Sequence, residues 1–107
     1  MKTALINAIL SQKIKIKPSI KFGEVQCYVR QATVASQKEI EKISDDENSQ
    51  LKIVALILCD ENGDLIFDKD NSEDLSVLEN LTAETIAKIC NDYTDFNFRQ
   101  PETEKKQ

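Results

Sequence analysis

Acidic side chains crowded into residues 60–74 are the first candidates for chemistry in this sequence. Counted from residue 68, the first, third, fifth and twelfth positions carry oxygen ligands of the kind that a calcium-binding EF-hand loop uses: Asp68, Asp70, Ser72 and Glu79. The sixth position is Glu73, where such a loop needs a glycine for its sharp turn. Acids at a helix N-terminus explain the same residues. We therefore expect no bound metal and no cofactor, with a calcium-responsive regulatory or adaptor protein as the alternative.

Cysteine and histidine chemistry has little support. Cys27, Cys59 and Cys90 are far apart and stand among apolar neighbours, which is typical of small core residues. The sequence contains no histidine, so histidine-based triads and the usual zinc sites are excluded. Its only glycines, Gly23 and Gly63, are too few for a phosphate-binding loop. We expect no catalytic residue and a protein that is not an enzyme.

Length and composition indicate a single small domain. The chain has 107 residues, of which 40% are hydrophobic and 31% are charged, as in ordinary globular proteins. No apolar run approaches the roughly 18 residues that a membrane helix needs, and no signal-peptide cleavage site follows the N-terminal apolar stretch. We expect a cytoplasmic protein with one domain over residues 1–97 and a disordered tail over residues 98–107, where the apolar pattern is lost.

Charge is divided unevenly along the chain. Residues 1–30 hold six basic residues against one acidic residue, a net +5, so the remainder carries −10 of the overall −5. A nucleic-acid-binding protein would show a basic domain or a basic face with interleaved aromatic residues. Neither is evident, and we expect no nucleic-acid partner. The N-terminal lysines either meet an acidic partner or a neighbouring copy's acidic face, or they keep a strand edge in solvent.

The first thirty residues predict a short helix and a hairpin. Residues 3–10 carry the apolar stripe of a helix that is too short to be stable alone in water, so it must dock on the domain or on a partner. Residues 13–17 alternate like a strand, and Pro18 is expected to end its pairing. Two extended segments around Gly23 predict an antiparallel hairpin. Alternate positions of its second segment predict the core side: Val25, Cys27 and Val29.

Residues 53–68 form the most hydrophobic stretch, and it can be read in two ways. Asn62-Gly63 followed by an apolar return favours a hairpin. Ser49, preceded by acidic residues, favours a helix over residues 50–59 that ends at a left-handed Gly63. We prefer the helix, although periodicity alone does not decide between them.

Three further helices are predicted. The first begins between Thr33 and a capping box at Ser36 and Glu39, with Val34, Ile40 and Ile43 facing inward. The second covers residues 72–80, with Leu75, Leu78 and Leu81 facing inward. The third, capped by Thr82, covers residues 83–96. The expected fold class is α+β: an N-terminal helix, a small antiparallel sheet with its hairpin around Gly23, then three to four packed helices.

Binding is the remaining class of function. The N-terminal stripe and the stripe of residues 83–96 hold more apolar surface than a small domain easily buries, which favours a partner helix or self-association. Completion of a single core explains both stripes equally well. We predict partner contacts at Tyr28 and Arg30, which would project together from the hairpin, and at four residues of the last stripe: Ile86, Ile89, Tyr93 and Phe96.

Two segments resemble a known family. The apolar run followed by CDENGDLIF at residues 59–67 is similar to the central signature of the tail assembly chaperones of long-tailed, non-contractile bacteriophages and prophages. VQCYVRQAT at residues 25–33 resembles the valine-arginine pair and threonine-led helix that open the same family's core. Order and spacing fit over residues 23–96. Neither motif is catalytic.

The resemblance implies a function and partners. Such chaperones bind and solubilise the long, helical tape measure protein in the bacterial host cytoplasm, help recruit tail tube subunits around it, and are absent from the mature virion. Many families also make a longer product by frameshifting. The resemblance thus implies a non-catalytic protein that works as a homo-oligomer with the tape measure protein and the tail tube protein as partners. The family has no site motif that assigns contact residues.

Overall fold

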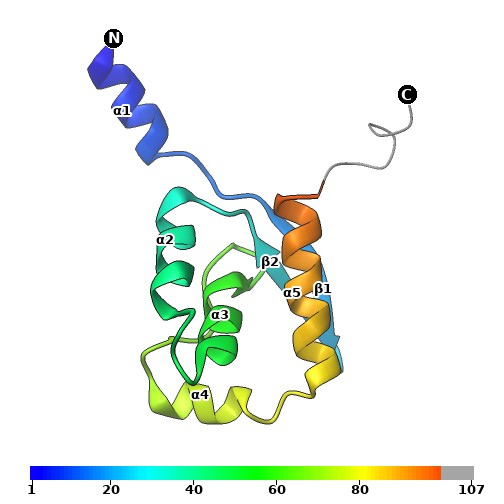
Figure 1. Cartoon of the computed structure of the whole chain (residues 1–107). Helices are drawn as coiled ribbons and strands as arrows, with labels where there is room; N and C mark the ends of the chain where they lie inside the picture. Colours follow the sequence, from blue (N-terminus) through cyan, green and yellow to red (C-terminus); the bar gives the residue numbers. More distant parts are fainter. Residues whose placement is uncertain (100–107) are drawn as a thin grey trace, which may run out of the picture.

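The computed structural model describes residues 1–99 of the 107. The last eight residues, which hold most of the predicted tail, lie outside the described residues. Within residues 1–99 the chain forms five helices and one three-stranded antiparallel sheet in the order β1-β2-β3 (Figure 1), which confirms the predicted α+β class. The elements are α1 (Lys2–Leu10), β1 (Ile16–Phe22), β2 (Val25–Arg30), α2 (Val34–Ile43), α3 (Ser49–Ile57), β3 (Leu58–Cys59), α4 (Ser72–Leu78) and α5 (Ala83–Asn97).

The hairpin around Gly23 is present as predicted. Strands β1 and β2 pair in antiparallel fashion up to Phe22 opposite Val25, and Gly23 takes a positive φ of 62° in the turn. The prediction that Pro18 ends the strand is wrong, because β1 begins at Ile16 and Pro18 pairs with Tyr28 inside it. An edge strand tolerates a proline whose missing N–H is not needed by a neighbour. A register shift follows between Pro18 and Lys21.

The central hydrophobic stretch contains both of the structures that its sequence allowed. Helix α3 ends at Ile57, two residues earlier than predicted, and β3 then pairs with β2. Asp60 accepts hydrogen bonds on its Oδ1 from the backbone N–H groups of Asn62 at 2.8 Å and Asp64 at 3.0 Å. Gly63 is left-handed at φ 84°, as predicted. The cap is Asn48 rather than Ser49, and Asn48 makes no side-chain capping bond.

Helix α2 begins at the earlier of its two candidate caps. Thr33 and Ser36 form the capping box, in which each side chain accepts from the other's backbone N–H, at 3.1 Å and 2.9 Å. The predicted box of Ser36 with Glu39 is therefore wrong. Val34 is 76% exposed, so its predicted inward position is also wrong; Ile40 and Ile43 do pack against the core.

Helices α4 and α5 follow the prediction closely. Asn71 caps α4, which ends at Leu78 with that side chain buried and with Leu75 and Leu81 packed beside it. Thr82 caps α5 by accepting from the N–H of Thr85 at 3.0 Å.

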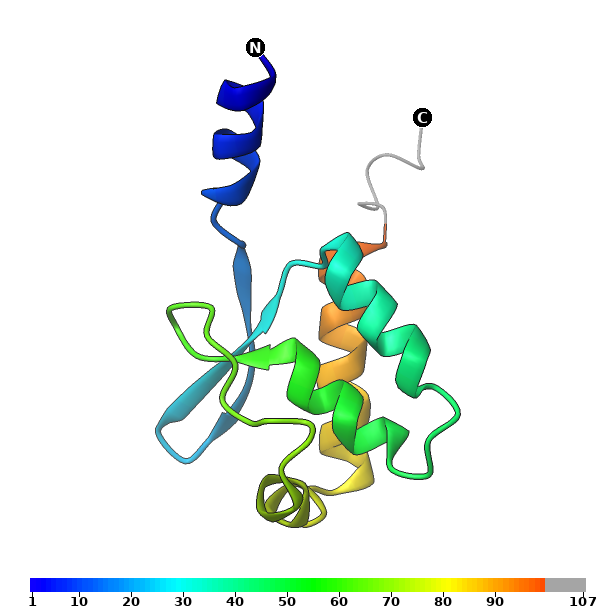
Figure 2. The same cartoon turned by 90° about the vertical axis from the view of Figure 1, so that its left-hand side faces the viewer.

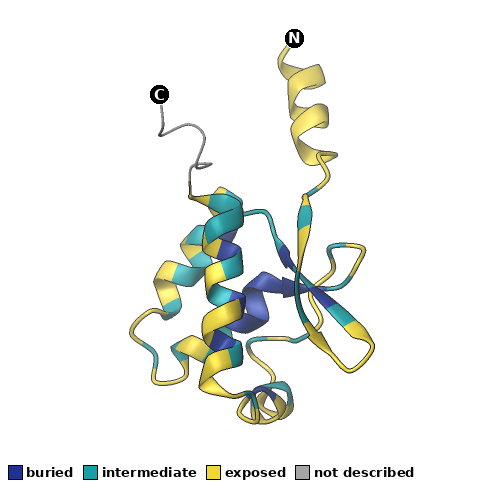
Figure 3. Cartoon of the chain, turned by 90° about the vertical axis from the view of Figure 1, so that its right-hand side faces the viewer, coloured by how far each residue is buried: buried dark blue, intermediate teal, exposed yellow. Residues whose placement is uncertain are grey.

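The core lies between the sheet and the helices. Helices α2, α3 and α5 lie on one side of the sheet (Figure 2), and α5 packs against β1 and β2. Buried residues gather where α3 and α5 meet β2 and β3 (Figure 3). The largest fully buried side chains of the core, which also includes Leu78 of α4, are Ile57, Leu58, Leu78, Ile89, Val29 and Val54. Cys27 and Val29 face this core as predicted, whereas Val25 is 65% exposed. No helix among residues 1–99 is both long enough and apolar enough to cross a membrane.

Helix α1 stands apart from the rest. It projects from the start of β1 (Figures 1 and 2), and every one of its residues is exposed (Figure 3). Of the two alternatives that the sequence left open, docking on its own domain is not seen in this structure, and docking on a partner stays a prediction.

Candidate functional site

Helix α1 presents an uncovered apolar face. Leu5, Ile6, Ile9 and Leu10 are all exposed, Ile9 by 57%. The N-cap is Met1, whose side chain makes no capping bond, and the helix has no acidic residue in its first turn. A helix this poorly capped gains little from its own sequence, since most helical stability in proteins comes from packing an apolar face.

A second uncovered apolar surface lies at the far end of the hairpin, and we call it the apolar groove. The tip of the β1-β2 hairpin extends away from α5 (Figure 2), and the two side chains on either side of its turn, Phe22 and Val25, are 42% and 65% exposed. The groove encloses about 340 Å³ and is lined by apolar side chains from the hairpin, β3, the loop before α4, and α4 with the residues after it: Phe22, Val25, Cys27, Leu58, Ile66, Phe67, Val77, Leu78 and Leu81.

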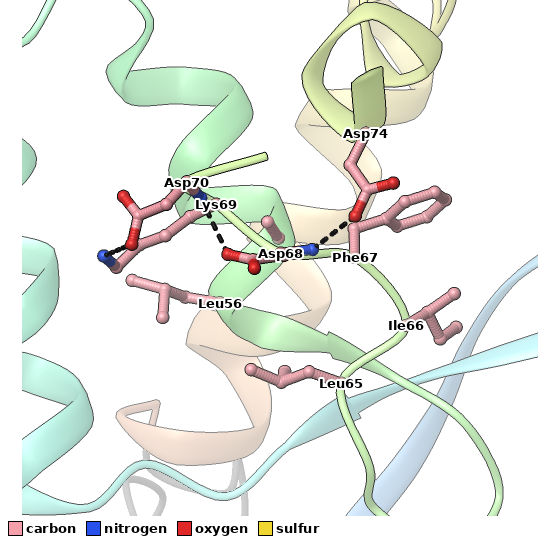
Figure 4. Close-up of a pocket in the computed structure, with 9 residues that line it drawn as sticks. Leu56, Leu65, Ile66, Phe67, Asp68, Lys69, Asp70 and Asp74 are labelled. Carbon is pink, nitrogen blue, oxygen red and sulfur yellow. Dashed lines mark hydrogen bonds and ion pairs between the residues drawn. The ribbon is translucent and has the colours of Figure 1, made fainter. Parts of the chain in front are cut away.

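An acidic pocket of about 390 Å³ adjoins the groove, and Ile66 and Phe67 line both. Its floor is apolar and its rim carries charge from Asp68, Lys69, Asp70 and Asp74 (Figure 4). Three carboxylates and one ammonium give this rim a formal net charge of −2. The pocket therefore favours a basic side chain with an aliphatic stem.

Hydrogen bonds hold the rim of the acidic pocket in place. Asp74 accepts from the backbone N–H of Asp68 at 2.8 Å, and Asp68 accepts from that of Asp70 at 2.8 Å (Figure 4). Lys69 pairs with Asp70 at 3.0 Å and with Glu39 at 3.4 Å. The hydrogen bond to Asp70 is the main cause that raises the pKa of Lys69. Asp70 is thus partly neutralised, whereas Asp68 and Asp74 have no ion pair among the described residues.

The residues of the calcium alternative do not converge. Asp68 and Asp70 lie in the loop before α4, Ser72 is the first residue of α4 and Glu79 is its C-cap, so the helix separates the ends of the proposed ligand set. Among residues 1–99 no group of three histidine, cysteine or acidic side chains is placed to hold a metal ion. The oxygens of Asp68 and Asp74 accept from backbone N–H groups instead. Nothing in the geometry favours the calcium alternative.

The six predicted contact residues fall into two places. Tyr28 and Arg30 are half-buried on the face of β2 opposite buried Cys27 and Val29. On α5, Ile86, Ile89 and Tyr93 are buried in the core and Phe96 is partly buried against it. Partner contact at these α5 positions stays a prediction, and it would require α5 to leave the sheet.

Burial also determines the chemistry of Tyr93 and the cysteines. The Tyr93 hydroxyl donates to Gln37 Oε1 at 2.9 Å, and burial raises its pKa. Burial raises the pKa of Cys59 to about 11, and it raises the pKa values of Cys27 and Cys90. The thiol, not the reactive thiolate, is therefore the form present at neutral pH, which fits a packing role.

Sequence reasoning did not find the groove. Its exposed members Phe22, Val25, Ile66 and Val77 come from three separate segments. The apolar return at residues 65–67 was the one available signal. Their convergence depends on the tertiary placement of the hairpin against α4, which local periodicity does not encode.

Comparisons with known proteins give a fold. No model of a known protein family matches the sequence, and no curated protein is significantly similar to it. Among solved structures, the tail assembly chaperone of bacteriophage HK97 matches with a TM-score of 0.62 over 94% of this chain and 100% of that chain, at 12% sequence identity. The chain therefore has a fold like that of a phage tail assembly chaperone. The HK97 protein's named role is non-enzymatic.

Proposed function

We propose that this protein is a tail assembly chaperone of a long-tailed phage or prophage, which binds and solubilises the tape measure protein and helps recruit tail tube subunits. The single observation that carries the proposal is the fold match to the HK97 chaperone, which spans nearly the whole of both chains. Two motifs, at residues 25–33 and 59–67, independently point to the same family of chaperones.

The surface of the described residues suits such a role. Apolar side chains are exposed on α1 and around the groove, and exposed patches of this kind mark interaction surfaces. The chain as a whole carries a net charge of −5. Apolar surface would cover the apolar face of a client helix, while the net negative charge would keep the complex from aggregating.

We assign the client contact to the outer face of the sheet around Tyr28 and Arg30. Both side chains are half-buried on β2, where helices lie only on the opposite side (Figure 2). Tyrosine and arginine are enriched at protein interfaces because each combines a large apolar body with polar ends.

Co-expression with the tape measure protein of the same phage tests the proposal. The soluble fraction of the tape measure protein should rise several-fold with the chaperone, and the two proteins should co-purify. Arg30→Glu should reduce co-purification, whereas Lys42→Glu, an equal charge change at an exposed side chain of α2, should not. A tape measure protein that stays as insoluble as it is alone would overturn the proposal. Recruitment of tail tube subunits is tested by adding the tail tube protein to the purified complex.

A further inference from the structure

We propose that α1 of one copy docks in the apolar groove of a second copy, with residues 11–15 of the first copy lying across the second copy's acidic pocket. This interface is distinct from the client surface assigned to Tyr28 and Arg30. The groove thereby has one occupant, the N-terminal helix of another copy of this chain.

Helix α1 needs a surface to be stable. It has nine residues, none of them buried, and its N-cap supplies no side-chain hydrogen bond. An isolated helix shorter than about 12 residues is marginal in water. Its persistence as a helix is therefore explained if its four exposed apolar side chains are covered in the assembled state.

The groove has the character that a short apolar helix requires. Every lining side chain is apolar or a cysteine, and several are exposed, with Val25 at 65% and Val77 at 57%. An amphipathic helix laid into such a groove is a recurring mode of recognition, in which side chains at i, i+3, i+4 and i+7 act as anchors. Counted from Lys2, the apolar residues Leu5, Ile6 and Ile9 of α1 fall at i+3, i+4 and i+7.

On both docking surfaces an apolar part is followed by a charged part. In the N-terminal segment, apolar helix α1 is followed by Lys13 and Lys15. On the receiving surface, the apolar groove is followed by the acidic pocket, and Ile66 and Phe67 join the two. A helix seated in the groove with its C-terminal end toward Ile66 would bring the two lysines to the acidic rim. Opposite charges placed in this way fix the direction of docking.

A copy's own α1 is poorly placed to fill its own groove. The chain enters the sheet at Ile16, whereas Phe22, which lines the groove, is at the other end of seven-residue β1, about 20 Å away at 3.3 Å per residue. The six steps from Leu10 to Ile16 span about 20 Å when fully stretched, which brings only the C-terminal end of α1 to that point. In this structure α1 projects the other way, and α1 and α4 lie at opposite ends (Figure 1).

The contact is heterologous, because α1 and the groove are different surfaces of the chain. Two defective variants should therefore repair each other when mixed. A variant with a damaged α1 still offers an intact groove, and a variant with a damaged groove still offers an intact α1. Neither associates alone, but together they form one productive contact.

Exposed positions allow this test without disturbing the core. Leu5→Asp with Ile9→Asp damages α1, and Val25→Asp or Val77→Asp damages the groove from two different elements. Val34→Asp is the matched control, since Val34 is 76% exposed on α2 and lines neither surface. A carboxylate buried without a partner is costly, so each damaging change should weaken self-association by about ten-fold or more. Circular dichroism and thermal unfolding check that every variant is folded.

Sedimentation velocity of the full chain over a range of concentrations gives the result. The unaltered chain and the Val34→Asp control should associate, the α1 and groove variants should stay at 12.1 kDa, and an equimolar mixture of an α1 variant with a groove variant should form a 1:1 dimer. A monomeric unaltered chain, association that survives either set of changes, or a mixture that stays monomeric would each overturn the proposal. No client is present, so this outcome is independent of whether the tape measure protein is bound.

Discussion

Helices α5 and α1 both carry broad apolar faces in the sequence, yet the structure buries one and leaves the other bare. Ile86 and Ile89 of α5 are in the core, whereas Ile6 and Ile9 of α1 are exposed. The difference lies in the polar side chains of the two helices. Asn97 of α5 bonds to backbone groups of Arg30, the last residue of β2, and of Ala32 just after it, whereas α1 makes no side-chain hydrogen bond to another element among residues 1–99.

This contrast shows that an apolar stripe predicts that a helix face will be buried, but not which element will bury it. Polar side chains identify the covering element. Each can complete its hydrogen bonds in only one arrangement, and an unpaired buried donor or acceptor is costly. Helix α5 has such groups directed at its own sheet. The basic residues that follow α1 are matched instead by the acidic pocket, which is why we assign α1 to another copy.

The largest expected effect on stability comes from truncating one isoleucine of α5, compared with the same truncation on α1. Ile89→Ala should lower the free energy of unfolding by about 2–5 kcal/mol, because Ile89 is 0% exposed and a cavity would remain. Ile9→Ala should change it by less than about 0.5 kcal/mol. Urea denaturation at a concentration where the chain is monomeric measures both. Comparable losses would mean that α1 packs on its own domain, and the contrast would fail.

A second pair of variants compares an asparagine of α5 with an asparagine of α1. Asn97 donates to the carbonyl of Arg30 at 3.0 Å and accepts from the N–H of Ala32 at 2.7 Å. Asn97→Ala leaves both groups unpaired and should cost about 1–3 kcal/mol. Asn7→Ala on exposed α1 is the control, and it should have almost no effect on the monomer. Equal unfolding midpoints for the two variants would show that Asn97 does not anchor α5.

The smallest expected effect is a pH dependence of the folding stability, which arises from Asp92 on α5. Burial opposes ionisation of Asp92, but hydrogen bonds from Ser19 at 2.6 Å and Lys88 at 3.0 Å, together with nearby positive charge, lower its pKa. A carboxyl with a lowered pKa in the folded state stabilises the fold above its unfolded pKa of about 3.9. That contribution is lost as pH falls through the folded pKa.

Ser19→Ala tests this contribution against the unaltered chain. The variant should be less stable by about 1 kcal/mol or less at pH 6, and the difference should shrink as the pH is lowered from 5 to 3. Thermal unfolding across this range measures it. A difference that is constant with pH would show that the Ser19 bond does not depend on the charge of Asp92.

Much of the fold follows from local signals in the sequence. Gly23 and Gly63 mark turns because each takes a positive φ. Thr82 caps α5 where expected, and α5 ends one residue beyond the predicted boundary. These features depend on side chains acting on their own neighbouring backbone, so a single stretch of sequence contains the information.

Features that depend on distant segments were not predictable in the same way. Pro18 was expected to end a strand, but its place at the edge of the sheet makes its missing N–H harmless. Residues 53–59 divide into a helix and a strand because Leu58 and Cys59 meet β2. The apolar groove likewise arises where the hairpin and β3 approach α4 and the loop before it. The acidic pocket arises where α3 approaches the same loop and the start of α4. The sequence left open whether Ile86 and Ile89 face a core or an interface, and the packing of α5 on the sheet buries both.

The short connection between α1 and β1 has a consequence for how the protein responds to its own abundance. Since α1 projects away from its own groove (Figure 1), the proposed docking depends on how many copies are present. Scarce copies would keep free helices and empty grooves, while abundant ones would fill both. Five linking residues would thus make the chain sensitive to its own expression level, without any ligand or chemical modification.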